Sequence, residues 1–98
     1  MIAVIFEVEM REGKGQAYFD LAAQLRPELE KIDGFISVER FESLTTKGKY
    51  VSLSFWRDED AVSAWRDHFE HRAAQEKGRA EIFADLRIRV AKVMRDYR

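Results

Sequence analysis

The chain has 98 residues, of which 46% are hydrophobic and 36% charged, and these values fit one globular domain spanning residues 1–98. A formal net charge of -1, without long runs of either sign, argues against a nucleic acid or an anionic membrane as partner. The absence of cysteine excludes disulfides, zinc–thiolate sites and thiol nucleophiles.

The first half of the chain alternates between a strand pattern and a helix pattern. Residues 2–10 place apolar side chains at every second position, which predicts a first strand. Residues 16–32 place them at helical spacing and predict an amphipathic helix of about four turns. We expect Pro27 to kink or break this helix, because proline removes a backbone hydrogen bond, and Gly34 to cap its end.

The second half repeats these patterns. Residues 35–43 and 49–57 alternate around the loop 44–48, so they should form an antiparallel pair. Asp58 is a natural N-cap for a second helix that ends or bends near Gly78, and alternation over 86–94 predicts a fourth strand. The order strand, helix, strand, strand, helix, strand predicts an α+β fold of the ferredoxin-like βαββαβ kind, with both helices on one sheet face.

The strand patterns also indicate a partner. Val51, Leu53 and Phe55 alternate with polar and aromatic residues, and the first strand is apolar on both faces near its start. Two helices cover only one sheet face, so the other face would expose a large apolar patch. We therefore predict a homodimer in which two sheets pack together.

The second helix carries the residues most suggestive of chemistry. If 65–79 is one helix, then His68, His71, Gln75 and Arg79 form a polar stripe flanked by Trp65. This stripe could border a cleft and offer an imidazole as a base near neutral pH. Histidines on an amphipathic helix are more often solvated or capping groups, and His-x-x-His alone is a weak metal signal, so we expect no metal site.

Other candidates come from the strands. Tyr50 and Ser52 could supply hydroxyl groups to the cleft, and Arg87 could point a positive charge into it, although side chains of these kinds commonly meet solvent. Phe6 and Trp56 could line or fill it. The chain shows no nucleophile elbow, Walker loop or dinucleotide fingerprint. The first residues show no basic leader and no apolar run is long enough for a membrane span, so we expect a cytoplasmic protein.

Three segments carry a family resemblance that covers nearly the whole chain. They are VIFEVEMREGKGQAYFDL, GFISVERFES and FWRDEDAVSAWRDHFEHRAAQEKGRAEIFADLRIRVAKV. In element order, in the paired Trp56 and Trp65 and in the AAQxxGR segment, the chain resembles the antibiotic biosynthesis monooxygenase family of dimeric α+β barrels. The resemblance implies a homodimer with one pocket per subunit between sheet and helices.

The resemblance frames two enzymatic hypotheses. In the first, a quinol, phenol or anthrone type of aromatic loses a proton and its anion reduces O₂ without a cofactor. Trp65 would then wall the pocket, His68 or His71 would be the base, and Arg87 or Arg79 would stabilise the anion.

The second hypothesis is haem degradation, which is disfavoured because two of the residues that haem-degrading members use are different in this chain. Trp65 matches the tryptophan that haem-degrading members of the family use, but Gln75 stands where their axial histidine is expected and Phe6 near their asparagine. Without the imidazole the main hold on iron is lost. A third hypothesis is a non-catalytic dimer that binds a small molecule or acts in stress, since fold does not fix function.

Overall fold

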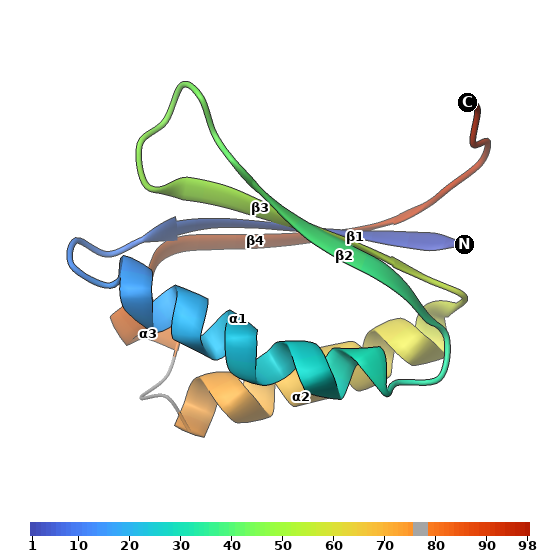
Figure 1. Ribbon diagram of the computed structural model, residues 1–98, viewed down its shortest axis with the longest axis horizontal. Coiled ribbons are helices and arrows are strands. Elements are labelled where there is room, and N and C mark those ends of the chain that lie inside the picture. Colours follow the sequence, from blue (N-terminus) through green and yellow to red (C-terminus); the bar gives the residue numbers. More distant parts are fainter. Residues whose placement is uncertain (76–78) are drawn as a thin grey trace.

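The computed structural model describes residues 1–75 and 79–98, without the side chains of Gln75, Arg79 and Ala80. Its elements are β1 (Ile2–Met10), α1 (Gly15–Glu30), β2 (Phe35–Glu42), β3 (Lys49–Trp56), α2 (Glu59–Gln75), α3 (Arg79–Ile82) and β4 (Phe83–Lys92). The strands form one antiparallel sheet in the order β2-β3-β1-β4. Both long helices lie against the same face of this sheet (Figure 1), which confirms the ferredoxin-like βαββαβ arrangement.

The core lies between the helices and one sheet face. Strand β1 turns Val4, Phe6 and Val8 toward the helices, and all three are buried. The helices pack apolar stripes at the expected spacing against these residues: Tyr18, Leu21, Leu25 and Leu29 on α1, and Ala61, Val62, Trp65, Phe69 and Ala73 on α2. Asp58 caps α2 by accepting a hydrogen bond from the Ala61 N–H at 3.0 Å, as predicted.

An ion pair joins the two long helices outside this core. Arg72 on α2 donates through Nε to Oε1 of Glu28 on α1 at 3.0 Å, and a second guanidinium nitrogen bonds the same oxygen. The Nδ1 atom of His68 lies 3.6 Å from the other Glu28 oxygen. These bonds hold the pKa of Glu28 below its usual value, chiefly because Arg72 donates to the carboxylate.

Several predicted boundaries are wrong. Helix α1 runs unbroken through Pro27, because Pro27 and Ala23, whose carbonyl would bond its missing N–H, are both exposed to water. This helix ends at Glu30, and Lys31 is its C-cap in place of Gly34. Gly34 instead leads into β2 with φ of 97°.

The chain between α2 and β4 also differs from the prediction. Helix α2 is described as far as Gln75, and a short helix α3 that we did not expect precedes β4. Residues 76–78 of the predicted helix 65–79 lie outside the described residues. Strand β4 begins at Phe83 and ends at Lys92, because buried Ile82 and Phe83 anchor this segment against the core. Gly78, which we expected to end the second helix, lies outside the described residues.

The second sheet face is uncovered in the single chain. The side of the sheet opposite the helices, which we call the open sheet face, carries the apolar residues Ile5, Phe41, Val51, Leu53 and Phe55. The charged residues Glu7, Glu39, Arg87 and Arg89 lie on the same side. Phe41 is 46% exposed and the other four apolar residues are half-buried. No helix among the described residues is long and apolar enough to cross a membrane.

Candidate functional site

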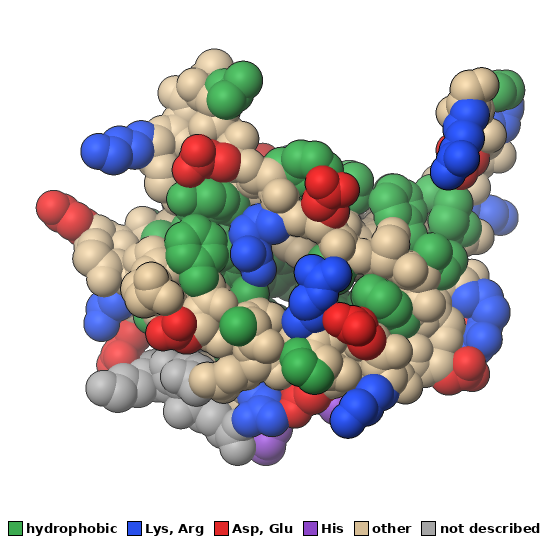
Figure 2. Space-filling model, viewed as in Figure 1, with side chains coloured by type: hydrophobic (Ala, Val, Ile, Leu, Met, Phe, Trp, Pro, Cys, Tyr) green, Lys and Arg blue, Asp and Glu red, His purple; other side chains and the backbone are tan. Residues whose placement is uncertain are grey.

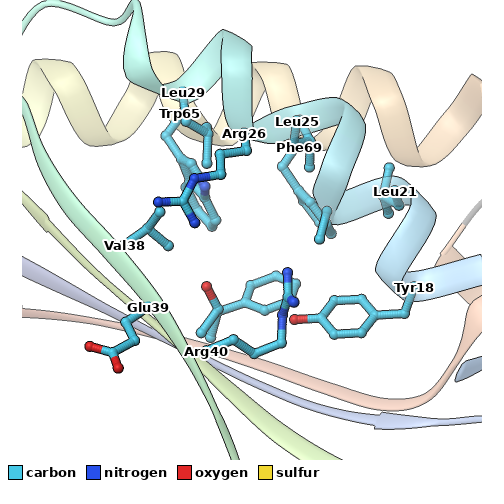
Figure 3. Close-up of a pocket in the computed structure, with 13 residues that line it drawn as sticks. Tyr18, Leu21, Leu25, Arg26, Leu29, Val38, Glu39, Arg40, Trp65 and Phe69 are labelled. Carbon is cyan, nitrogen blue, oxygen red and sulfur yellow. The ribbon is translucent and has the colours of Figure 1, made fainter. Parts of the chain in front are cut away.

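A cavity of about 450 Å³ lies between α1, α2 and the sheet. Its lining comes from α1, α2 and three strands: Phe6, Tyr18, Leu21, Ala22, Leu25, Arg26, Leu29, Val38, Glu39, Arg40, Ser52, Trp65 and Phe69. The volume and the mainly apolar lining are typical of small-molecule sites. Figure 3 shows the opening between α1 and β2.

Three aromatic rings form the inner wall. Trp65 and Phe69, one turn apart on α2, stack with ring centres 5.9 Å apart and an angle of 11° between planes. Phe6 meets both edge-on, at 6.0 Å from Trp65 and 5.0 Å from Phe69. Each ring is almost fully buried, so the wall is rigid and offers a flat apolar surface to a ligand.

Tyr18 brings a polar group into this apolar space. Its ring is 4% exposed, and Figure 3 shows its hydroxyl pointing into the cavity toward the Arg40 guanidinium. Burial raises the pKa of Tyr18, and the positive charge of Arg40 opposes that rise. The phenol therefore stays protonated at neutral pH and can donate a hydrogen bond.

Two arginines stand at the opening on opposite sides, Arg26 on α1 and Arg40 on β2 (Figure 3). The Arg40 guanidinium lies over the rings of Tyr18 and Phe19, at 5.2 and 5.5 Å from their centres. Arg26 bonds Glu30 at 3.1 Å, and both of these side chains are more than half exposed. Arg26 and Arg40 thus bring positive charge to the opening, where the acidic residue Glu39 also lies, whereas the interior is mainly apolar.

The structure brings three of the predicted site residues to this cavity, namely Phe6, Ser52 and Trp65. Trp56 is fully buried elsewhere in the core, where its Nε1–H donates to Ser54 Oγ at 2.9 Å. Tyr50 does not line the cavity either, since its hydroxyl donates to Glu42 at 2.9 Å.

The remaining predicted residues lie elsewhere. His68 and His71 are exposed on α2 and do not line the cavity, because Trp65 and Phe69 occupy the inward face of that helix. Arg87 is exposed on β4, opposite Glu7 on the far side of the sheet. Gln75 and Arg79 were predicted as ligand contacts, but their side chains lie outside the described residues.

Sequence reasoning missed four polar residues of the cavity, Tyr18, Arg26, Glu39 and Arg40. Arg26 follows Ala22 by one helical turn on the side of α1 that borders the cavity, and this spacing could have indicated it. Tyr18 falls within the helical apolar spacing of residues 16–32, and that pattern predicts burial of its ring but no role for its hydroxyl. Arg40 gave no such signal, because charged residues on a strand ordinarily face water.

The lining also bears on cofactors. The haem-degrading hypothesis calls for an axial histidine, and the described residues that line the cavity include no histidine, so they do not fit that hypothesis. Within residues 1–75 and 79–98, no three His, Asp or Glu side chains are placed to hold a metal ion together.

Comparisons with known proteins agree with this architecture. The chain is 46% identical over 93 residues to the jasmonate monooxygenase ABM of Pyricularia oryzae, covering 95% of this chain but only 43% of that protein. It is 34% identical over 93 residues to YqjZ of Bacillus subtilis, covering 95% and 79% of the two chains. The crystal structure of Rv0793 from Mycobacterium tuberculosis superimposes with a TM-score of 0.82 at 21% identity, over 97% of this chain and 96% of that one. The model of the family "Antibiotic biosynthesis monooxygenase" matches residues 1–77, and with the 34% identity across most of YqjZ it makes this chain a member of that family.

Proposed function

We propose that the protein is a cofactor-independent monooxygenase that oxidises a small electron-rich ring compound with O₂ in the cavity between α1, α2 and the sheet. The observation that carries the proposal is an apolar cavity of about 450 Å³, with a flat aromatic wall and a protonated phenol, in a member of a monooxygenase family. Such a site binds a ring by stacking and keeps water away from its reactive anion.

The chemistry balances without an external reductant when the substrate is of the anthrone type. A CH₂ group between two aromatic rings loses a proton, and the resulting anion gives one electron to O₂. The two radicals combine to a peroxide, which loses water to leave a ketone. In sum, CH₂ and O₂ become C=O and H₂O, so the substrate supplies every electron.

The chain's own groups suit the first of these steps. Loss of the proton places negative charge on the substrate oxygen, and a hydroxyl donor stabilises that charge in a low-dielectric site. Tyr18 and Ser52 line the cavity with such donors. They lower the pKa of the bound substrate, so its proton can leave to water at the opening.

The two histidines are tested separately as bases. His68 and His71 are exposed and outside the cavity lining, so the proposal does not route the proton through them. If either is the base after all, a His68→Ala/His71→Ala variant loses a factor of about 10² in kcat and retains binding. An unchanged kcat and an unchanged pH profile near neutrality would rule this out.

A second substrate class is favoured by the 46% identity to a jasmonate monooxygenase. Jasmonate is a cyclopentanone with a carboxylic acid side chain, so its ring also suits an apolar cavity. Hydroxylation of an unactivated C–H bond consumes two electrons beyond those the substrate gives up, and a reductant must supply them. Dependence on added reductant therefore separates the two classes.

The test is O₂ uptake by the purified protein with anthrone, a hydroquinone and jasmonate, each with and without a reductant. The Tyr18→Phe variant keeps the ring and removes the donor, so we expect a kcat lower by about 10²-fold. The matched control is Tyr50→Phe, which removes a hydroxyl outside the cavity and leaves the rate unchanged. Binding without O₂ uptake on any substrate would favour a non-catalytic binding role.

We also infer that two copies associate through the open sheet face. Its five apolar residues are half-buried or exposed in the single chain, and a two-fold sheet-on-sheet contact would remove them from water. The pair of cavities would then lie on the outer sides of the dimer, because the helices cover the opposite sheet face.

A further inference from the structure

The opening of the cavity combines features that suit one kind of ligand group. Figure 2 shows basic side chains on both sides of a hollow in this face of the molecule, and Figure 3 identifies Arg26 and Arg40 at the opening. The two residues come from different elements, α1 and β2. They therefore converge on the opening through the fold and not through sequence proximity.

Arg40 is the better placed of the two for binding an anion. Its guanidinium is positioned by the rings of Tyr18 and Phe19 and also forms a hydrogen bond with the Tyr18 side chain. A guanidinium carries five N–H donors, so donors remain for a ligand. Within the described ranges 1–75 and 79–98, Arg40 forms no ion pair with a carboxylate, whereas Arg26, Arg57, Arg72 and Arg89 each do. Its positive charge faces the cavity without a neutralising partner there.

Arg26 can contribute to the same group. Its partner Glu30 lies one turn away on the exposed surface, with side-chain exposures of 61% for Arg26 and 52% for Glu30. An exposed pair of this kind contributes little, so a ligand carboxylate can compete for the guanidinium. Two planar guanidinium groups are well matched to the two oxygens of one carboxylate.

We propose that Arg40 and Arg26 receive the carboxylate of the substrate, and hence that this protein acts on small lipophilic carboxylic acids whose ring enters the aromatic cavity. The inference deepens the proposed function, since it concerns the same cavity. Phosphate esters and multiply charged acids suit the site less well, because the interior beyond the two arginines is lined by Leu25, Val38 and Phe69. The reacting carbon would lie inside, near Tyr18, and the carboxylate at the opening.

Binding tests this without catalysis. Naphthalene-1-acetate and naphthalene-1-acetamide have nearly the same shape and differ in charge, and calorimetry compares their Kd values on the purified protein. A charge-assisted hydrogen bond to a carboxylate predicts that the acid binds about 10- to 100-fold more tightly than the amide. Raising the salt concentration should weaken the binding of the acid and leave the Kd of the amide unchanged.

Variants locate the effect. Arg40→Gln removes the charge from an exposed residue and should reduce the preference for the acid to less than threefold, and Arg26→Gln should reduce it in part. Arg66→Gln is the matched control, because Arg66 is an exposed arginine of α2 that does not line the cavity. It should keep the full preference.

Three results would overturn the inference: equal affinity for the two compounds, a preference that survives in Arg40→Gln, or no binding of either. O₂ uptake is a separate readout, so the two proposals can fail independently. Acid-selective binding without O₂ uptake would contradict the proposed monooxygenase activity and support the proposed carboxylate site. O₂ uptake with uncharged substrates alone would support the monooxygenase activity and contradict the carboxylate site.

Discussion

Filling the cavity should stabilise the protein and block its function at once, and Ala22→Phe is the change that does so. Ala22 lies on α1, is half-buried and lines the cavity. Burying a phenylalanine side chain contributes about 1.5–3 kcal/mol. Lost rotamer freedom costs about 0.5–1 kcal/mol and the weaker helix propensity about 0.5 kcal/mol. The net gain is about 1 kcal/mol, which raises the Tm by about 4–8 °C in a domain of this size.

The neighbouring Ala23→Phe is the matched control. Ala23 is exposed on the same helix, so the new ring has the same propensity cost but gains no burial, and the free energy of unfolding should fall by about 0.5 kcal/mol. Calorimetric Tm values and calorimetric binding of naphthalene-1-acetate are measured on both variants and the parent. Ala22→Phe should melt higher and bind at least tenfold more weakly. A lower Tm would mean that the ring does not enter the space, and unchanged binding would mean that the ligand site lies elsewhere.

Three further predictions concern the framework. Gly34→Ala should destabilise the protein by about 1–3 kcal/mol in urea unfolding, because φ there is 97° and the added methyl carbon would lie 2.9 Å from Ala61 Cβ; equal stability would contradict this account of the turn. The pKa of Glu28 is lowered from 4.5 by Arg72, so its contribution to stability is present above pH 4.5 and is lost as the pH falls through the lower folded-state value. Between about pH 5 and about pH 3, wild type should therefore lose more stability than Glu28→Gln in parallel urea titrations, and parallel curves would count against the ion pair. Leu53→Glu places a charge on the open sheet face and should convert the dimer to a folded monomer, as measured by sedimentation. If the wild-type protein itself sediments as a monomer, the proposed dimer is wrong.

The fold could be predicted from the sequence because its main signals are local. Alternation over residues 2–10 gave a strand with the bounds observed for β1. The start of β4 could not be found this way. Phe83 and Leu86 are both turned toward the core, yet three positions separate them, so alternation is broken there. The pairing of β1 with β4 shifts register between Glu9 and Met10, and that irregularity depends on the partner strand, which a single-strand pattern does not contain.

Of the candidate site, two aromatic residues of the wall and one polar residue, Ser52, were predicted. Trp65 and Phe6 were expected near the cleft because large aromatic residues on inward faces build pocket walls as well as cores. The histidines were expected there because they are the groups with suitable acid–base chemistry, but chemistry does not decide which side of a helix faces the sheet. On α2 the inward direction is fixed by Trp65, Phe69 and Ala73, and His68 lies to the side of that stripe, near Glu28.

Arg40 owes its place at the cavity to an irregularity in β2. Strict alternation from Phe35 would put Ser37 and Glu39 on the helix side and turn Arg40 to the open face. The pairing with β3 instead shifts between Phe35 and Ser37, so that Val38 pairs with Ser54, and Arg40 with Ser52, on the helix side. One extra residue thus reverses the rest of the strand, as expected for a bulge, and aims a guanidinium into an otherwise apolar space. The position of the Arg40 charge, which we assign to substrate binding, depends on how β2 pairs with β3. For this reason no sequence motif indicates it.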